Sequence, residues 1–261
     1  MNDLAQAVFD NQRIKSQIIQ LMWEASDVIL KVYQSETINL QKKADASPVT
    51  QADLAAHQVL VNGLAELTPD IPVVSEEDSQ SLDIPRKHAT FWLIDPLDGT
   101  KEFINRNGEF TCNLALISDQ RPVYGWVSVP VQNMLYHGGR DLGAMRVERE
   151  GDTQPIRCQP NSDPVRIVAS KSHLNSETKE FVEAIDENIE LVQAGSSLKF
   201  LKIAEGQADL YPRLAPTCEW DTAAAHAVLE GAGGTVTQVD GAVLQYGKPE
   251  ILNPHFIARA F

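Results

Sequence analysis

The sequence predicts a mixed fold in two parts, an α+β half followed by an α/β half. Three observations support this prediction. Apolar residues keep a helical spacing over the first 32 residues, short β-rich runs follow one another between residues 71 and 139, and strand and helix patterns alternate after residue 164. The chain has 261 residues and is 43% hydrophobic, so it can bury one large core or two of ordinary size.

Two helices are expected before the first strands. Apolar residues recur every three or four positions from Leu4 to Val32, which predicts one long amphipathic helix. A second helix should begin after Thr50, which can act as its N-cap, with Asp53 at the capping-box position. Its apolar stripe lies within residues 60–67. These helices would cover one face of the sheet that follows.

The sheet of the first half should be mostly antiparallel, because its strands are separated by short turns. Strands are predicted on residues 71–75, 90–94, 110–117, 122–130 and 133–139. The polar, Gly- and Pro-containing segment 149–164 then predicts a domain boundary, giving subdomains 1–155 and 156–261. In the second half, strands are predicted on 165–170, 189–193, 208–213 and 235–239, with helices from about Asn175, on 196–206 and on 220–233.

The composition limits the classes of partner. Lys and Arg number 22 against 36 Asp and Glu, a net charge of -14, which repels nucleic-acid polymers and anionic lipid surfaces. The three cysteines lack metal-ligand spacing, which fits a reducing cytosol. The N-terminus shows no export signal, and no apolar run reaches the length of a membrane span. A cytoplasmic protein is therefore expected.

The stretch "DPLDGT", residues 95–100, follows an apolar strand. Pro96 fixes one dihedral of a turn and Gly99 permits a close approach, so the turn can present Asp95, Asp98 and the Leu97 carbonyl on one side. These hard oxygen ligands suit magnesium, manganese or calcium. Ordinary turn chemistry explains the Asp-Pro pair alone or the Asp-Gly pair alone. It is a weaker explanation for both pairs together, with Thr100 directly after them.

Two further acids stand where they could join this turn. Glu76 ends a strand in "VVSEED", and Asp221 begins a helix in "EWDTAAAH"; a solvated acidic loop and a favourable helix dipole are the alternative explanations. Two carboxylates about 5 Å apart at an effective dielectric of about 20 repel by roughly 3 kcal/mol. If the acids converge, bound dications are needed, which predicts a two-metal site for phosphate-ester hydrolysis. The spacing differs from the D-x-D-x-T of covalent aspartyl phosphatases.

Longer motifs resemble those of the inositol monophosphatase superfamily. "DPLDGTKEF" is preceded by "SEED" and followed far downstream by "WDTAAAHAVLEGAGG". Within the superfamily, "KKADASPVTQADLAAH", "DGTKEFINRNGEFT", "ASKSH" and "GSSLKFLKIAEGQADLYPR" look like 3′(2′),5′-bisphosphate nucleotidases of the CysQ type. The likeness extends from the first helix to Asn253. It implies a layered α-β-α-β sandwich with the active site between two subdomains.

The resemblance also implies metal ligands. Glu76, Asp95 and the carbonyl of Leu97 would hold a first Mg²⁺, and Asp95, Asp98 and Asp221 a second. A third, weaker ion would contact Glu76. Mn²⁺ is expected to substitute for Mg²⁺, whereas Li⁺ and Ca²⁺ are expected to inhibit.

Catalytic and substrate-binding roles follow from the same resemblance. Asp53 and Thr100 would orient and deprotonate the attacking water, with Glu76 as a competing or assisting base. The residues expected to bind substrate are Gly99, Thr100, Lys101, His173, Ser196, Lys199 and Arg213. For the single His and Lys residues, a helix-start position and a solvated helix face are the alternatives.

The implied reaction is removal of the 3′-phosphate from adenosine 3′,5′-bisphosphate, giving AMP and phosphate in sulfate assimilation, with 3′-phosphoadenylyl sulfate as another candidate substrate. One alternative is an inositol-1-phosphate phosphatase of the same fold, although "TKEF" and "GSSLK" argue against it. Another is a non-catalytic module that binds divalent metal. Monomer and homodimer both stay open, as does a peripheral position on the cytoplasmic face of the inner membrane.

Overall fold

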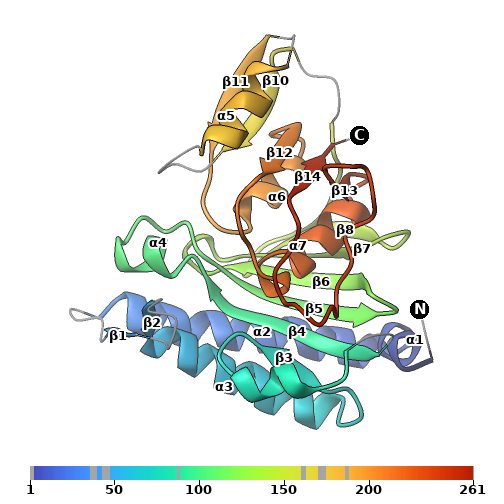
Figure 1. Cartoon of the computed structure of the whole chain (residues 1–261). Coiled ribbons are helices and arrows are strands. Elements are labelled where there is room, and N and C mark those ends of the chain that lie inside the picture. The colour runs from blue at the N-terminus through green and yellow to red at the C-terminus, as the bar shows by residue number, and fades with distance from the viewer. Residues whose placement is uncertain are drawn as a thin grey trace.

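The computed structural model describes residues 3–35, 40–42, 48–86, 89–159, 163–169, 175–185 and 188–260. Its elements form alternating layers (Figure 1). Helices α2 and α3 cover one face of a seven-stranded sheet, α6 and α7 cover the other face, and a five-stranded sheet lies beyond them with α5 on its outer side. These layers contain the predicted α-β-α-β order, with α5 as a further outer layer, and confirm the predicted fold class.

The N-terminal helix is interrupted. Two helices, α1 (Asp3–Asp10) and α2 (Gln12–Tyr33), replace the single predicted helix, so that prediction was wrong. Asn11 has an extended backbone, and its side-chain oxygen accepts the N–H groups of Arg13 at 3.1 Å and Ile14 at 3.3 Å. Such a cap starts a new helix without changing the apolar spacing, which is why the spacing alone could not reveal the break.

The next helix begins as predicted. Thr50 caps α3 (Gln51–Leu67) by accepting the N–H of Ala52 at 3.0 Å. In return Asp53 Oδ2 accepts the backbone N–H of Thr50 at 2.8 Å, which completes the capping box. Asp53 is therefore fixed at the start of α3 by bonds within four residues of chain.

The seven-stranded sheet has the order β3-β4-β5-β6-β7-β8-β9. Its strands are β3 (Val73–Ser75), β4 (Thr90–Asp98), β5 (Thr111–Ser118), β6 (Arg121–Val129), β7 (Met134–Gly139), β8 (Gly143–Glu148) and β9 (Thr153–Ile156). Only β3 and β4 pair in parallel. The five predicted strands are confirmed, whereas β8 and β9, which carry few buried residues, were not predicted. A hairpin of β1 (Leu40–Lys42) and β2 (Pro48–Thr50) and the short helices η1 (Ser79–Asp83), α4 (Thr100–Ile104) and η2 (Pro130–Gln132) complete this half.

The second half contains the predicted alternation of strands and helices. Its sheet has the order β11-β10-β12-β14-β13, with strands β10 (Val165–Ala169), β11 (Ile189–Gln193), β12 (Leu210–Arg213), β13 (Thr235–Gln238) and β14 (Phe256–Arg259). The helices are α5 (Ser176–Glu183), α6 (Leu198–Ala204) and α7 (Glu219–Gly231). Strand β14, which the sequence did not predict, pairs antiparallel with β12 and β13.

Helix α7 joins the two halves of the molecule. It belongs to the second half by sequence but packs on β5, β6 and β7, and its buried residues share one core with both sheets. Gly125 on β6 allows a close approach, because a Cβ there would lie 2.0 Å from the Ala224 carbonyl oxygen. The backbone of α7 therefore rests on the sheet. Since the core is shared, the division into subdomains 1–155 and 156–261 stays a prediction.

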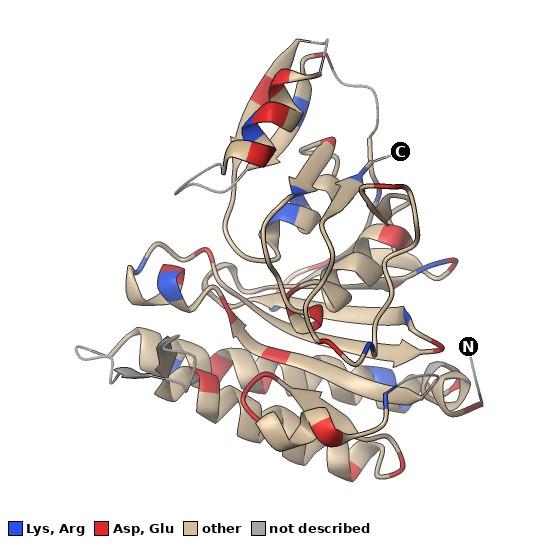
Figure 2. Ribbon diagram, in the orientation of Figure 1, with Lys and Arg blue, Asp and Glu red and all other residues tan. Residues whose placement is uncertain are grey.

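Acidic residues occur on many elements of the fold. Figure 2 shows Asp and Glu residues on both sheets and most helices, in keeping with the net charge of -14. In the part of the chain that the structure describes, no helix is both long enough and apolar enough to cross a membrane.

Replacing Gly125 with Ala should destabilise the protein by about 1–3 kcal/mol, because the new methyl group forces α7 away from β6. Urea unfolding measures this loss. Gly151→Ala is the matched control, since the three atoms nearest to a Cβ there belong to the side chain of Glu148 and not to the backbone of a packed helix. Equal stability of the two variants would contradict the close contact.

Candidate active site

Carboxylates from three separate elements meet at one end of β4. Glu76 follows β3, Asp95 lies within β4 and Asp221 lies in the first turn of α7. One carboxylate oxygen from each of the three lies within 4.8 Å of the others. The parallel pairing of β3 and β4 brings Glu76 to the same edge as Asp95, and its N–H donates to the Ile94 carbonyl at 3.2 Å. The expected convergence of these acids is thus present in the fold.

A bulge in β4 shapes the turn that carries Asp95 and Asp98. Asp95 pairs with Asn113 but Asp98 pairs with Thr111, so β4 holds one more residue than β5 between these two points. The strand therefore continues past Asp95, where the sequence suggested that it stops. Asp95 Oδ1 accepts the N–H of Leu97 at 3.0 Å, which fixes the carboxylate against its own backbone.

Gly99 makes the sharp change from β4 to α4. Its φ of 94° lies in the left-handed region, and a Cβ there would come within 3.2 Å of the Glu109 carbonyl oxygen. Thr100 then begins α4, and its hydroxyl lies 3.4 Å from the Leu97 carbonyl. The glycine therefore places Thr100 beside the turn that carries the two aspartates.

Asp98 is held from the other half of the molecule. Its Oδ2 accepts the Ser196 hydroxyl at 2.5 Å and the Ser197 backbone N–H at 2.7 Å, both just before α6. Ser196 has a left-handed backbone, with a φ of 49°, and its hydroxyl also lies 2.6 Å from that of Thr111. Asp98 lies outside the tightest group of three carboxylates, yet it is close enough to act on Asp95 and Asp221 electrostatically.

The carboxylates perturb one another strongly. Burial, followed by the negative charges of Glu76, Asp98 and Asp221, raises the pKa of Asp95 well above its usual value. Burial and the nearby Asp98 raise the pKa of Asp221 to about 8. Each shift means that the apo protein favours protonated forms of these groups. A divalent cation would relieve the same repulsion, so this site fits a hard metal ion bound by oxygen.

Asp53 and Thr100 lie side by side at the edge of this cluster. The Thr100 hydroxyl is 3.4 Å from Asp53 Oδ1, while Asp53 Oδ2 accepts both the N–H and, at 2.6 Å, the hydroxyl of Thr50. Burial raises the pKa of Asp53, although the hydrogen bonds from Thr50 oppose the shift. Two residues that are 47 positions apart in the sequence thus form the pair that the resemblance implied.

A pocket of about 310 Å³ opens beside the carboxylates. Of the predicted substrate-binding residues, Gly99, Lys101, Ser196, Lys199 and Arg213 line it, together with the predicted metal ligands Asp98 and Asp221. His173 lies outside the described residues. The sequence prediction missed the lining residues Glu102, Phe200, Tyr211, Thr217 and Thr222. Of these, Glu102, Phe200 and Thr222 stand inside the quoted motifs next to predicted site residues, a signal that could have found them.

The cations of the pocket have different environments. Lys199 is 7% exposed, and its ammonium group donates to the Ser196 carbonyl at 2.8 Å and lies 5.5 Å from the centre of the Tyr211 ring. Arg213 donates through Nη2 to the Pro216 carbonyl at 2.9 Å, whereas its buried Nε has no hydrogen-bond partner among the described residues. Lys101 is exposed. The three cations therefore differ in their exposure and in the hydrogen bonds that they already make.

Comparison with known proteins identifies the family. A sequence model of the inositol monophosphatase family matches residues 10–260. The chain belongs to this family. It is 46% identical over 242 residues to the 3′(2′),5′-bisphosphate nucleotidase CysQ of Escherichia coli strain K12, covering 92% of this chain and 97% of that protein. It is 32% identical to the protein of the same name from Haemophilus influenzae, covering 95% and 93%.

Solved structures of the inositol monophosphatase family share the fold. CysQ from Bacteroides thetaiotaomicron superimposes with a TM-score of 0.83 at 39% identity, covering 95% of this chain and 98% of that one. The inositol monophosphatase family comprises metal-dependent phosphatases, and the acidic cluster of Glu76, Asp95 and Asp221 offers a metal site at the expected place. The individual roles of the site residues stay predictions.

In metal chelator, the wild-type protein should lose stability relative to Asp221→Asn as the pH rises from about 5 to about 8. The folded pKa of Asp221 is raised from 3.8 to about 8, so its stabilising contribution is present at low pH and is lost as the pH rises through the folded value. Asn keeps an oxygen that can accept the Cys218 N–H, now 2.8 Å from Asp221 Oδ2. Urea unfolding of both proteins at both pH values measures the difference in their free energies of unfolding. The histidine contributions cancel in this difference, because both proteins contain the same histidines. A difference that is independent of pH would contradict the raised pKa.

Proposed function

We propose that the protein is a magnesium-dependent 3′(2′),5′-bisphosphate nucleotidase that converts adenosine 3′,5′-bisphosphate to AMP and phosphate. The observation that carries the proposal is the group of three carboxylates from β3, β4 and α7 beside the Asp53–Thr100 pair. The nucleotidase names of relatives up to 46% identical support the substrate class. On this proposal 3′-phosphoadenylyl sulfate is a further substrate, and the reaction serves sulfate assimilation.

The metal ligands of the proposal are those expected from the sequence. Glu76, Asp95 and the Leu97 carbonyl form a first Mg²⁺ site and Asp95, Asp98 and Asp221 a second, with a third, weaker ion at Glu76. Bound there, Mg²⁺ would polarise the phosphoryl group, acidify a water molecule and stabilise the leaving oxygen. Mn²⁺ would substitute, and Li⁺ and Ca²⁺ would inhibit.

The chain's own residues complete the chemistry of the proposal. The Thr100 hydroxyl orients a water molecule, and Asp53 Oδ1, 3.4 Å away, receives the proton through it. Burial raises the pKa of Asp53, which makes it a stronger proton acceptor. Glu76 is the competing or assisting base. The backbone N–H groups of Gly99 and Thr100, at the start of α4, face the phosphate.

Substrate recognition in the proposal depends on local cations, because the net charge of -14 repels a doubly phosphorylated nucleotide. Lys101, Lys199 and Arg213 line the pocket beside Asp98 and Asp221. Ser196 contributes by holding the turn that carries Asp98, and His173 stays a predicted contact with the substrate. A cytoplasmic or peripheral membrane location, and the choice between monomer and homodimer, are predictions that this proposal does not require.

The reaction is tested by measuring phosphate release from adenosine 3′,5′-bisphosphate and inositol-1-phosphate, with and without Mg²⁺. The wild type should prefer the nucleotide and require Mg²⁺. Thr100→Val should lose about 100-fold or more of the activity, since it removes the hydroxyl that orients water, and Thr100→Ser should retain most of it. Preference for the inositol ester would favour the alternative substrate. Thermal stabilisation by Mg²⁺ without turnover of either ester would show a non-catalytic metal-binding module.

The role of the pocket cations is tested on two substrates. Lys199→Gln and Arg213→Gln should each reduce kcat/KM for adenosine 3′,5′-bisphosphate by about 10- to 100-fold, the effect of losing one hydrogen bond to a charged group. Hydrolysis of adenosine 3′-monophosphate should change much less, because it lacks the second phosphate. Equal losses on both substrates would show that these residues do not bind that phosphate.

A further inference from the structure

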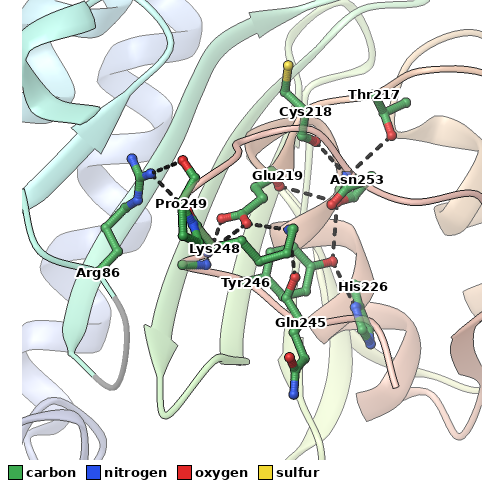
Figure 3. A network of polar contacts seen from close by, with 12 residues as sticks. Arg86, Thr217, Cys218, Glu219, His226, Gln245, Tyr246, Lys248, Pro249 and Asn253 are labelled. Atoms are coloured by element: carbon green, nitrogen blue, oxygen red, sulfur yellow. Dashed lines mark hydrogen bonds and ion pairs between the residues drawn. The ribbon is translucent and has the colours of Figure 1, made fainter. Parts of the chain in front are cut away.

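The segment 245–253, between β13 and β14, surrounds the start of α7 with polar contacts (Figure 3). Helix α7 carries Asp221 in its first turn, so whatever holds this turn also sets the position of the proposed metal ligand. Glu219 and the residues of segment 245–253 are not part of the lining of the pocket that contains the predicted substrate-binding groups, whereas Thr222, which they contact, is.

Glu219 is the centre of these contacts. It is the first residue of α7 and has no exposed surface. Its Oε2 accepts the Gly247 N–H at 2.7 Å, and its Oε1 accepts the Lys248 N–H at 3.1 Å and pairs with the Lys248 ammonium group. The Glu219 N–H in turn donates to the Ile251 carbonyl at 2.9 Å. A buried carboxylate with this many donors is fixed in one position, because the loss of any of these hydrogen bonds would cost free energy.

Asn253 holds the residues on either side of Asp221. Its Nδ2 donates to the Cys218 carbonyl at 2.8 Å and to the Thr222 hydroxyl at 3.0 Å. The Tyr246 hydroxyl lies 3.2 Å from the same Thr222 hydroxyl. The segment 245–253 therefore contacts Cys218 and Glu219, shortly before Asp221, and Thr222, directly after it.

The same segment is tied to the part of the chain that carries the other carboxylates. Arg86 lies between β3 and β4, and its Nη2 donates to the carbonyls of Lys248 at 2.9 Å and Pro249 at 3.2 Å. Glu76 is the first residue of this connection, and Asp95 lies in β4, which follows it. A continuous set of hydrogen bonds thus links the β3–β4 connection, through Lys248, to Glu219 and the start of α7.

We propose that Glu219 is a positioning residue that sets the place of Asp221 for metal binding. The inference rests on the proposed metal role of Asp221. Mg²⁺ requires near-octahedral ligands at about 2.0–2.1 Å, so a displacement of a few tenths of an ångström at the start of α7 weakens binding. Neighbours that orient a metal ligand without touching the metal typically change affinity by about 10- to 100-fold.

The test measures Mn²⁺ binding to the metal-stripped protein by calorimetry. Glu219→Gln places an NH₂ group against either the Gly247 N–H or the Lys248 donors, so it should weaken Mn²⁺ binding by about tenfold or more. In activity assays, the half-saturating Mg²⁺ concentration should rise by a similar factor, while kcat at saturating Mg²⁺ largely recovers.

Glu230→Gln is the matched control. Glu230 lies at the opposite end of α7, is also buried, and pairs with Arg121 at 2.7 Å and Arg140 at 3.1 Å. It should lose stability in urea without changing the Mn²⁺ dissociation constant by more than about twofold. Lys248→Gln, which removes one donor to Glu219 from a partly exposed position, gives a second measurement if Glu219→Gln does not fold.

The outcomes separate this inference from the proposed function. Weaker Mn²⁺ binding in Glu219→Gln, or in Lys248→Gln where the first variant is unfolded, with normal binding in Glu230→Gln, supports the positioning role. Unchanged binding in a folded Glu219→Gln variant, or equal weakening in all variants, overturns it while the metal site stands. A wild-type protein that binds no Mn²⁺ overturns both.

Discussion

The mutual repulsion of carboxylates at the end of β4 is the constraint on which the rest of this structure depends. At about 5 Å and an effective dielectric of about 20, each pair of ionised carboxylates repels by roughly 3 kcal/mol. Asp95 is almost fully buried, and three neighbouring carboxylates repel its negative charge. Burial and this repulsion raise its pKa. Groups that repel one another keep their positions only where the surrounding fold holds each of them separately. At this site, hydrogen bonds give each acid for which they are defined an anchor of its own.

Helix starts supply two of these anchors. Asp53 is the third residue of α3 and Asp221 is the third residue of α7, the N3 position of a capping box. Each accepts the backbone N–H of the residue that precedes its helix. The remaining aspartates use other means: Asp95 accepts an N–H of its own turn, and Asp98 accepts two donors from the Ser196–Ser197 pair. The protein's own hydrogen bonds therefore hold each of these four carboxylates in its place in the site.

The local parts of this design could be predicted from the sequence, whereas the contacts between distant segments could not. The capping box at Thr50 and the "DPLDGT" turn involve neighbouring residues, so their chemistry can be read directly. The break at Asn11 was missed because the apolar spacing continues across it. The bonds from Ser196 to Asp98 join residues 98 positions apart, and no local pattern encodes such a pairing. Strand β14 likewise depends on partners elsewhere in the chain.

The Ser196 turn also connects the cation side of the pocket to the carboxylate side. The Lys199 ammonium group donates to the Ser196 carbonyl at 2.8 Å, while the Ser196 hydroxyl holds Asp98. Ser196 has a left-handed backbone, which costs energy in a non-glycine residue and persists only because these contacts hold it. On the proposed function, a phosphate group that drew Lys199 away would remove one support of the turn that holds Asp98. The proposed anion site and the proposed cation site therefore share one support, the turn at Ser196.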